Sequence, residues 1–260
     1  MKSVIRVVFF HGLLLILFNF TSNLFAQSVD LEFNEARILF ENRDLISISK
    51  AMIALEKIIA KNPDHLETQA LLSFVYAHQA SIARQIGQPS IDYENSASAF
   101  STSVLAVQSN HRMALKTNAF LLLSNGNRID AKKIIDAQIQ PNETDIDWLY
   151  MQAVVSEEDK TIPILSAALS LNTSHVWIYF DMAMRSVKSN NLPNADKWLS
   201  GLKVKYPHIA EIDLLQIVIA AYKNDRNAVE EHAANFLKKM PSSLISKKIH
   251  AAIKRQASGN

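Results

Sequence analysis

The chain has 260 residues, 27 of them Lys or Arg and 25 of them Asp or Glu, and it contains no cysteine. The lack of cysteine excludes disulfides, thiolate catalysis, cysteine-ligated zinc and lipid attachment through a cysteine. The formal net charge of +2 belongs to Lys2 and Arg6, the only charged residues among the first 26. The rest of the chain is therefore formally neutral, and general attraction to nucleic acid is not expected.

The first 26 residues are predicted to be a cleavable signal peptide. Lys2 and Arg6 precede an apolar stretch at residues 7–20, and Ala26 supplies a small residue at the expected cleavage point. The stretch is shorter than the roughly 20 apolar residues that span a bilayer, so an uncleaved anchor is the less favoured alternative. Leu24 is an imperfect partner for Ala26 in the small-x-small pattern, which leaves the cleaved bond open. We expect a periplasmic or secreted protein with no stable membrane span once the signal is removed.

Beyond residue 26, turn residues recur at a nearly constant interval, which is typical of stacked helix pairs. Successive intervals are 46, 32, 32, 34 and 34 residues, and the longer first one indicates an insert near residues 87–92. The predicted domains are the signal peptide at 1–26, a helical repeat domain at 27–244 and a basic capping helix and tail at 245–260. The turns lie at Pro63, Ser109, Pro141, Thr173, Pro207 and Pro241.

Apolar residues spaced three and four apart predict two helices in each unit. The first unit occupies residues 31–64, and its second helix has an apolar stripe that includes Ile48, Leu55 and Ile58. Every proline after the signal lies at a turn or near a helix start, as an all-helical chain requires. Later helices are predicted at 66–86, 93–107, 113–123, 129–139, 148–155, 162–171, 177–187, 193–203, 212–222, 228–239 and 244–255.

These units resemble the tetratricopeptide repeat pattern, in which small residues let paired helices approach and a proline stops the second helix. The resemblance implies an all-α, right-handed superhelical solenoid of antiparallel helix pairs, with about six repeats plus a C-terminal capping helix. Asn42, Thr161 and Val229 depart from the pattern, which bears on the local twist more than on the fold class. The matching residues are Ala51, Leu55, Ile58 and Pro63 in the first unit, Trp148, Met151, Leu165, Ala168 and Leu169 in the fourth, and Tyr179, Met182, Ala183, Ala195, Leu199, Leu202 and Pro207 in the fifth.

Arrays of this kind present the first helix of each pair on the concave side, so the resemblance implies a peptide-binding groove there. Apolar, aromatic and methionine side chains in such a groove would suit an extended or helical peptide. The alternative for any one of these residues is a place in the core between neighbouring helices. The predicted groove residues are Phe74, His78, Lys116, Phe120, Leu149, Phe180, Met184, Leu214 and Val218.

Signals for catalysis or for cofactor binding are missing from the sequence. The four glycines beyond the signal are far apart, whereas a phosphate-binding loop, a dinucleotide fingerprint and a nucleophile elbow all need clustered glycines. We therefore expect no enzymatic activity, no catalytic residue and no cofactor.

Histidines and carboxylates near helix starts are expected to be structural. Equivalent positions in stacked repeats lie roughly 10 Å apart, too far for one metal ion, so we expect no metal and a surface position for the histidines. Asp145 and Asp147 precede an apolar helix, where the helix dipole accounts for their charge. The histidines that follow successive turns are His65, His111, His175 and His208.

The sequence thus favours a non-enzymatic periplasmic adaptor that binds a protein or peptide segment in envelope assembly, secretion or protein maturation. Residues Gln79 to Ser81 and the insert give a short similarity to helical-repeat subunits of cytochrome c maturation, which implies recognition of an unfolded apocytochrome without haem binding. The alternative is a component of a solute transport system that binds a small ligand, as in repeat proteins that accompany some carboxylate transporters. The sequence names neither the partner nor the oligomeric state.

Overall fold

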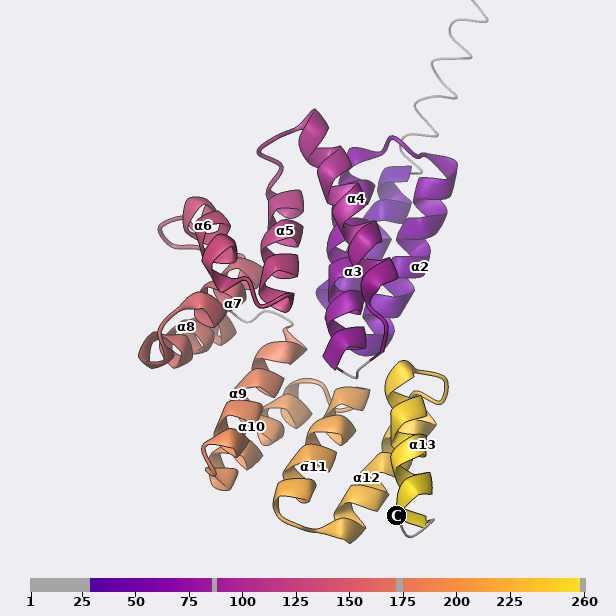
Figure 1. The fold of residues 1–260 in the computed structure, drawn as a ribbon, viewed down its shortest axis with the longest axis vertical. Coiled ribbons are helices and arrows are strands. Elements are labelled where there is room, and N and C mark those ends of the chain that lie inside the picture. The colour runs from indigo at the N-terminus through magenta and orange to yellow at the C-terminus, as the bar shows by residue number, and fades with distance from the viewer. Residues whose placement is uncertain (1–28, 86–87, 172–174, 258–260) are drawn as a thin grey trace, which may run out of the picture.

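The computed structural model describes residues 29–85, 88–171 and 175–257 (Figure 1). The predicted signal peptide at 1–26 and part of the predicted insert lie outside these residues. Within the described ranges every regular element is an α-helix and no strand occurs, which confirms the all-α prediction. None of the described helices combines the length and the hydropathy needed to cross a membrane.

The helices follow one another as antiparallel pairs (Figure 1). A helix at residues 29–41 comes first. It is followed by α2 (Leu45–Lys61), α3 (Leu66–Gln85), α4 (Ile91–Val107), α5 (Arg112–Ser124), α6 (Arg128–Gln138), α7 (Ile146–Val155), α8 (Glu158–Ser170), α9 (Val176–Lys188), α10 (Leu192–Lys205), α11 (Ala210–Tyr222), α12 (Arg226–Lys239) and α13 (Leu244–Ala257).

Most of these bounds lie within two residues of the predicted ones, but α8 begins at 158 rather than 162. Pro163 is therefore inside this helix and not in its first turn. Two features explain the earlier start. Glu157 and Asp159 add negative charge near the positive end of the helix, and the Thr161 hydroxyl donates to the Ala153 and Glu157 carbonyls at 3.1 and 3.2 Å.

Four of the turns between paired helices share one construction, and in the first of them Arg43 has φ of 57° and Asp44 caps α2; the other three use glycine or asparagine. Their middle residue has a left-handed backbone, with φ of 78° at Gly126 and 57° at Asn190 and Asn224. Glycine and asparagine tolerate this conformation, which ends a helix. The next residue in each turn then caps the following helix, as when the Asn191 side chain accepts the backbone N–H of Asn194 at 3.2 Å. Short turns of this kind keep the pairs antiparallel and in register.

The first helices of the pairs form the inner layer of the solenoid. Helix α5 packs against both α3 and α7, and α9 packs against α11, while the second helices lie outside them. Separate apolar clusters fill the successive interfaces. This stacking is the helical solenoid that the sequence predicts.

The two ends of the array contact each other, so the inner surface is not an uninterrupted groove. Leu45 at the start of α2 packs in one buried cluster with Ala210, Phe236 and Ile245 from α11, α12 and α13. The backbone N–H of Leu45 also donates to Glu211 Oε1 at 2.5 Å. Figure 1 shows α13 beside the ends of α2 and α3. We call this contact the closure seam.

Candidate functional site

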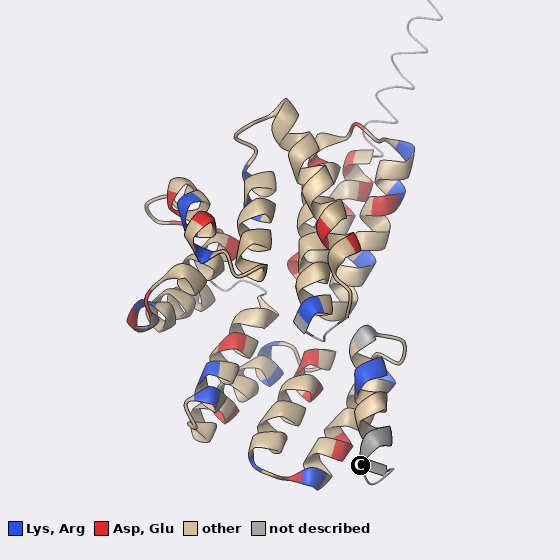
Figure 2. Cartoon of the chain, viewed as in Figure 1, with Lys and Arg blue, Asp and Glu red and all other residues tan. Residues whose placement is uncertain are grey.

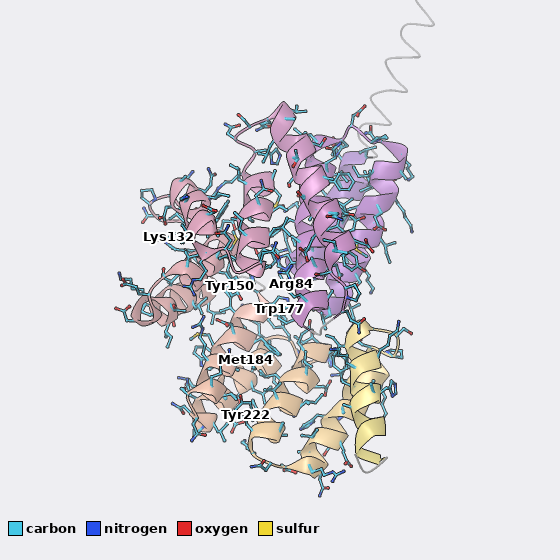
Figure 3. The ribbon with its side chains drawn as sticks, in the orientation of Figure 1. Arg84, Lys132, Tyr150, Trp177, Met184 and Tyr222 are labelled. Atoms are coloured by element: carbon cyan, nitrogen blue, oxygen red, sulfur yellow. The ribbon has the colours of Figure 1, made fainter. Side chains whose placement is uncertain are left out.

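A cavity of about 260 Å³ lies on the inner layer, between the N-terminal and C-terminal units. Side chains from α3, α5, α7 and α9 converge on it, and Tyr150, Trp177 and Met184 lie near the middle of the molecule (Figure 3). Asp181 and Lys188 add charge to the lining. We call this cavity the inner pocket, and its apolar and aromatic lining includes His78, Phe120, Tyr150, Trp177, Phe180 and Met184.

Four of the nine predicted groove residues line the inner pocket, namely His78, Phe120, Phe180 and Met184. They come from three different units, so the fold brings together side chains that are distant in the sequence. The other five lie elsewhere. Phe74 is buried in the N-terminal core, Lys116 is buried among charged groups, Leu149 packs on the cluster of α8 and α9, Leu214 packs on the closure seam, and Val218 is half-buried.

Aromatic rings are closely packed around the inner pocket. The ring centroids of His78 and Phe120 are 4.5 Å apart, and those of Tyr150 and His175 are 5.5 Å apart in a stacked arrangement. Burial lowers the pKa of His78 to about 3, with the Arg43 charge acting in the same direction, so this imidazole is neutral at neutral pH. The pocket therefore presents flat apolar surfaces with little charge at its base.

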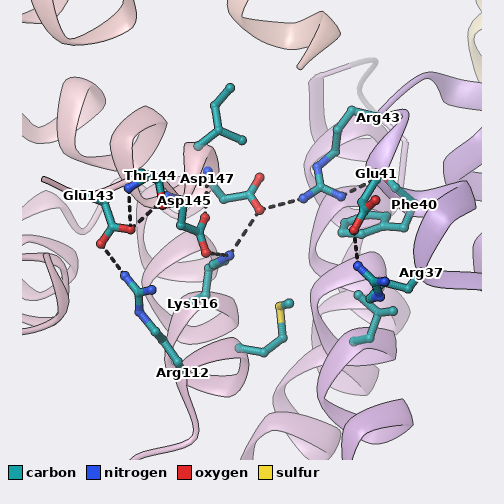
Figure 4. A pocket seen from close by; sticks show the side chains of 13 residues that line it. Arg37, Phe40, Glu41, Arg43, Arg112, Lys116, Glu143, Thr144, Asp145 and Asp147 are labelled. Carbon is teal, nitrogen blue, oxygen red and sulfur yellow. Dashed lines mark hydrogen bonds and ion pairs between the residues drawn. The ribbon is translucent and has the colours of Figure 1, made fainter. Parts of the chain in front are cut away.

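Beside the inner pocket, a buried charged cluster is centred on Asp147 (Figure 4). Arg43 Nη2 donates to Asp147 Oδ2 at 2.6 Å, and Lys116 Nζ donates to the same oxygen at 3.2 Å. His175 Nε2 lies 3.3 Å from Asp147 Oδ1. Lys116 also donates to Asp145 Oδ2 at 2.6 Å. These residues come from four different units, so the charged cluster ties the inner layer together.

Burial opposes ionisation of Asp147, but the neighbouring cations have the larger effect. The charges of Arg43 and Lys116, with the His175 hydrogen bond, hold the pKa of Asp147 well below its usual range. The pKa of His175 is lowered because burial of the ring outweighs the attraction of Asp147. Asp147 is therefore a paired carboxylate and not a free general base.

A second cavity, of about 580 Å³, borders the charged cluster, and its cations are paired with carboxylates. Arg112 donates to Glu143, and Arg37 donates to Glu41 (Figure 4). Among the described residues, no group of three or more His, Asp or Glu side chains is placed to hold a metal ion. The cations that line this cavity are thus paired with carboxylates of the chain itself.

The structure corrects the predicted surface position of two histidines. His175 is 2% exposed and His111 is 6% exposed, and they are the N-cap residues of α9 and α5. His175 meets Asp147, and His111 Nε2 lies 3.2 Å from Glu67 Oε1. By contrast, His208 is exposed as predicted.

The charged cluster was missed at the sequence level, although one signal pointed to it. Asp145 is the N-cap of α7, as the helix-start interpretation predicts, and accepts the Asp147 and Trp148 backbone N–H groups. The same interpretation was applied to Asp147, whose carboxylate instead faces cations from other units. Lys116 is the one cation among the predicted groove residues, and a cation on a buried face requires a partner.

No protein-family profile and no curated protein sequence matches this chain. Solved structures are similar in fold. A tetratricopeptide repeat protein from Parabacteroides merdae is 14% identical over 86% of this chain and 97% of its own, with a TM-score of 0.52. PilW, a type IV pilus biogenesis factor, is 13% identical over 86% of this chain and 98% of its own, with a TM-score of 0.50. The APC/C hetero-tetramer Cut9-Hcn1 is 15% identical over 82% of this chain but 39% of its own, with a TM-score of 0.62. The chain has the tetratricopeptide repeat fold.

Proposed function

We propose that this chain is a non-enzymatic scaffold of the cell envelope that binds a segment of a partner protein at the inner pocket. The observation that carries the proposal is the convergence of His78, Phe120, Phe180 and Met184 on one apolar cavity of the concave side. Clustered aromatic and methionine side chains give a large contact area and adaptable packing, which suits side chains of a bound peptide.

The size of the inner pocket fits one anchoring residue of such a segment. At about 260 Å³ it accommodates a large apolar or aromatic side chain. The closure seam bounds the inner surface, so the segment would enter beside Lys188 and Asp181 rather than run the length of the array. The remaining predicted groove residues would then act as neighbours of the binding site or as its support.

An envelope role is inferred from the predicted signal peptide at residues 1–26 and from the fold shared with PilW, which is a pilus biogenesis factor. Assembly, secretion and protein maturation all need proteins that hold a chain segment without modifying it. A role like that of the cytochrome c maturation subunits is one version of this proposal. It rests on the short similarity at residues 79–81.

The test is a binding measurement with matched variants. The exported chain is used to isolate its partner from an envelope extract, and the dissociation constant is then measured for wild type, Phe120→Ser and Phe180→Ser. Each variant is expected to weaken binding at least about tenfold, as loss of an interface anchor does. The control is Ile129→Ser on α6, which is exposed and does not line the pocket. Unchanged binding by the two pocket variants, with circular dichroism confirming that they fold, would overturn the proposal.

A second candidate function, small-ligand binding in a transport system, is favoured by the compactness of the cavity. Its volume of about 260 Å³ lies just below the usual lower limit of about 300 Å³ for small-molecule sites, which would suit a small ligand. Native mass spectrometry of the purified chain separates the two functions. A bound small molecule that is lost in Phe120→Ser, together with no protein partner, would favour the second candidate.

A further inference from the structure

At the N-terminal end of the array, no other described helix packs over the outer side of the first helix pair, which is formed by residues 29–41 and α2. Helix α3 covers one side of this pair, where Ala51 and Leu55 are buried against it. On the opposite side, a groove of about 280 Å³ runs between the two helices, with Leu39 and Ala54 in its lining. This is the side on which a preceding helix pair would pack in a longer array.

Large exposed apolar side chains occur on both helices, and Ile53 lines the groove itself. Leu31 and Ile38 on the first helix are 63% and 56% exposed, and Ile53 on α2 is 49% exposed. The other end of the array differs, because α13 covers the last pair and buries Ile245. Terminal units of solenoids normally have a polar outer face that keeps them soluble. The exposed face of the first pair departs from this pattern, because large apolar side chains accompany its charged ones and no other described helix packs over them.

Acidic and basic residues both occur at this end (Figure 2), and those that line the groove are separated by sign. Glu32 and Glu35 lie on the first helix, whereas Lys50, Lys57 and Lys61 lie on α2, and all five line the groove. Lys61 pairs with Glu32 at 3.2 Å. Among the described residues, no ion pair involves Glu35, Lys50 or Lys57. An acidic edge and a basic edge thus flank the exposed apolar residues.

We propose that this end of the array binds the same end of a second copy of the chain. A twofold axis along the groove places the first helix of one copy over α2 of the other. The Glu32–Lys61 ion pair gives the register of the two antiparallel helices. In the dimer this register brings Glu35 of one copy near Lys57 of the other, and Ile38 of one copy near Ile53 of the other. The surface is therefore complementary to itself in both charge and apolar character.

The size of this surface indicates a weak, concentration-dependent dimer. Helix α2 has 17 residues, so it is about 25 Å long, and two helices side by side are about 20 Å wide. Each copy then contributes about 500 Å², which together reach the lower limit of about 1,000 Å² for a specific interface. A dissociation constant on the order of 10 μM fits an interface of this size.

Sedimentation equilibrium of the purified chain, with its N-terminus read by mass spectrometry, tests the proposal. Wild type is expected to pass from monomer to dimer as concentration rises, and Ile53→Glu to raise the dissociation constant at least about tenfold. Ile129→Glu is the control, since Ile129 is equally apolar, 74% exposed and distant from the groove. A wild-type chain that stays monomeric up to about 1 mM overturns the proposal. The proposal is also overturned if mass spectrometry shows that the chain keeps residues 1–26 and the chain stays monomeric for that reason.

A charge swap makes the test independent of folding defects. Glu35→Lys and Lys57→Glu each place like charges opposite one another in the dimer and are expected to weaken it. The double variant exchanges the two signs, and the twofold axis restores complementarity, so its dissociation constant should return to within about threefold of wild type. Additive weakening in the double variant contradicts the proposed arrangement. Partner binding at the inner pocket is measured in parallel and is expected to be unchanged, because this surface and the pocket share no residues.

Discussion

Two buried carboxylates, Asp147 and Glu211, contact distant units of this array. The pKa of Asp147 is lowered, whereas that of Glu211 is raised. Asp147 lies in the charged cluster beside Arg43 and Lys116, which hold its pKa well below the usual range. Glu211 lies in the closure seam, where burial raises its pKa from 4.5 to about 7. The main effect in the opposite direction is the hydrogen bond from the backbone N–H of Leu45, which lowers the pKa of Glu211. Burial alone thus favours the neutral acid, and only adjacent cations reverse that effect.

This difference implies that the contacts of Asp147 and those of Glu211 respond differently to pH. The contacts of Asp147 are ionic, and their strength is constant between about pH 5 and pH 8, where carboxylates are ionised and lysine and arginine side chains are cationic. The contacts of Glu211 stabilise the folded state most when its carboxyl group is protonated.

The largest effect is expected for Asp147→Asn. This change leaves Arg43 and Lys116 in the interior without their shared counter-ion. Removing one partner of a buried ion pair costs about 3–5 kcal/mol, so the free energy of unfolding, measured with urea at pH 7, should fall by that amount. A loss of less than about 1 kcal/mol would show that the cluster is not holding the units together.

The next effect is a pH dependence that Glu211→Gln should abolish. A carboxyl group whose pKa is raised in the folded state contributes stability that is fully present below pH 4.5 and is lost as pH rises through about 7. The contribution is at most about 3 kcal/mol. Gln keeps an acceptor oxygen for Leu45 but does not titrate. Urea unfolding of both proteins between pH 4.5 and 8 should therefore show wild type losing stability relative to the variant as pH rises. Parallel curves would contradict the prediction.

A smaller effect, of about 2 kcal/mol, is expected for Lys116→Gln, since Arg43 and His175 still contact Asp147. Loss of one cation also weakens the lowering of the Asp147 pKa. A group with a lowered pKa contributes stability that is lost as pH falls. Acid unfolding followed by circular dichroism should thus begin at higher pH in this variant than in wild type. Identical acid midpoints would count against a role for Lys116 in ionising Asp147.

The smallest effect is expected for Asp136→Asn. Asp136 pairs with Lys132 at 2.7 Å on α6, but both side chains are about half exposed, where water and salt screen the interaction. The free energy of unfolding should change by less than about 0.5 kcal/mol. This variant is the matched surface control for Asp147→Asn. A comparable loss in the free energy of unfolding of both variants would show that burial is not what makes the ion pairs of Asp147 strong.

The sequence was sufficient to predict the local part of the structure. Apolar spacing and turn residues placed most helix ends within two residues, because helix boundaries depend on neighbouring groups such as the Asn191 cap. Four of the residues predicted for a groove, His78, Phe120, Phe180 and Met184, line one cavity from α3, α5 and α9, and their role in binding stays a prediction.

The long-range part could not be read from the sequence. Arg43 and Asp147 are 104 positions apart, and their meeting depends on the sum of small rotations between successive helix pairs. The closure seam has the same origin, since Leu45 and Glu211 are 166 positions apart. The repeat pattern fixes each step of the stack but not the accumulated curvature, and this is why the burial of His175 was also missed.

The seam between Leu45 and α11 changes how the molecule comes apart. In a linear stack the last unit has a single neighbour, so such rods fray from their tips. Here α2 packs against α3, and its first residue, Leu45, also contacts α11 and α13, so this end of the array has a second attachment. Melting of α11 would uncover α2 as well, and deuterium should enter the backbone amides of these two helices at matched rates.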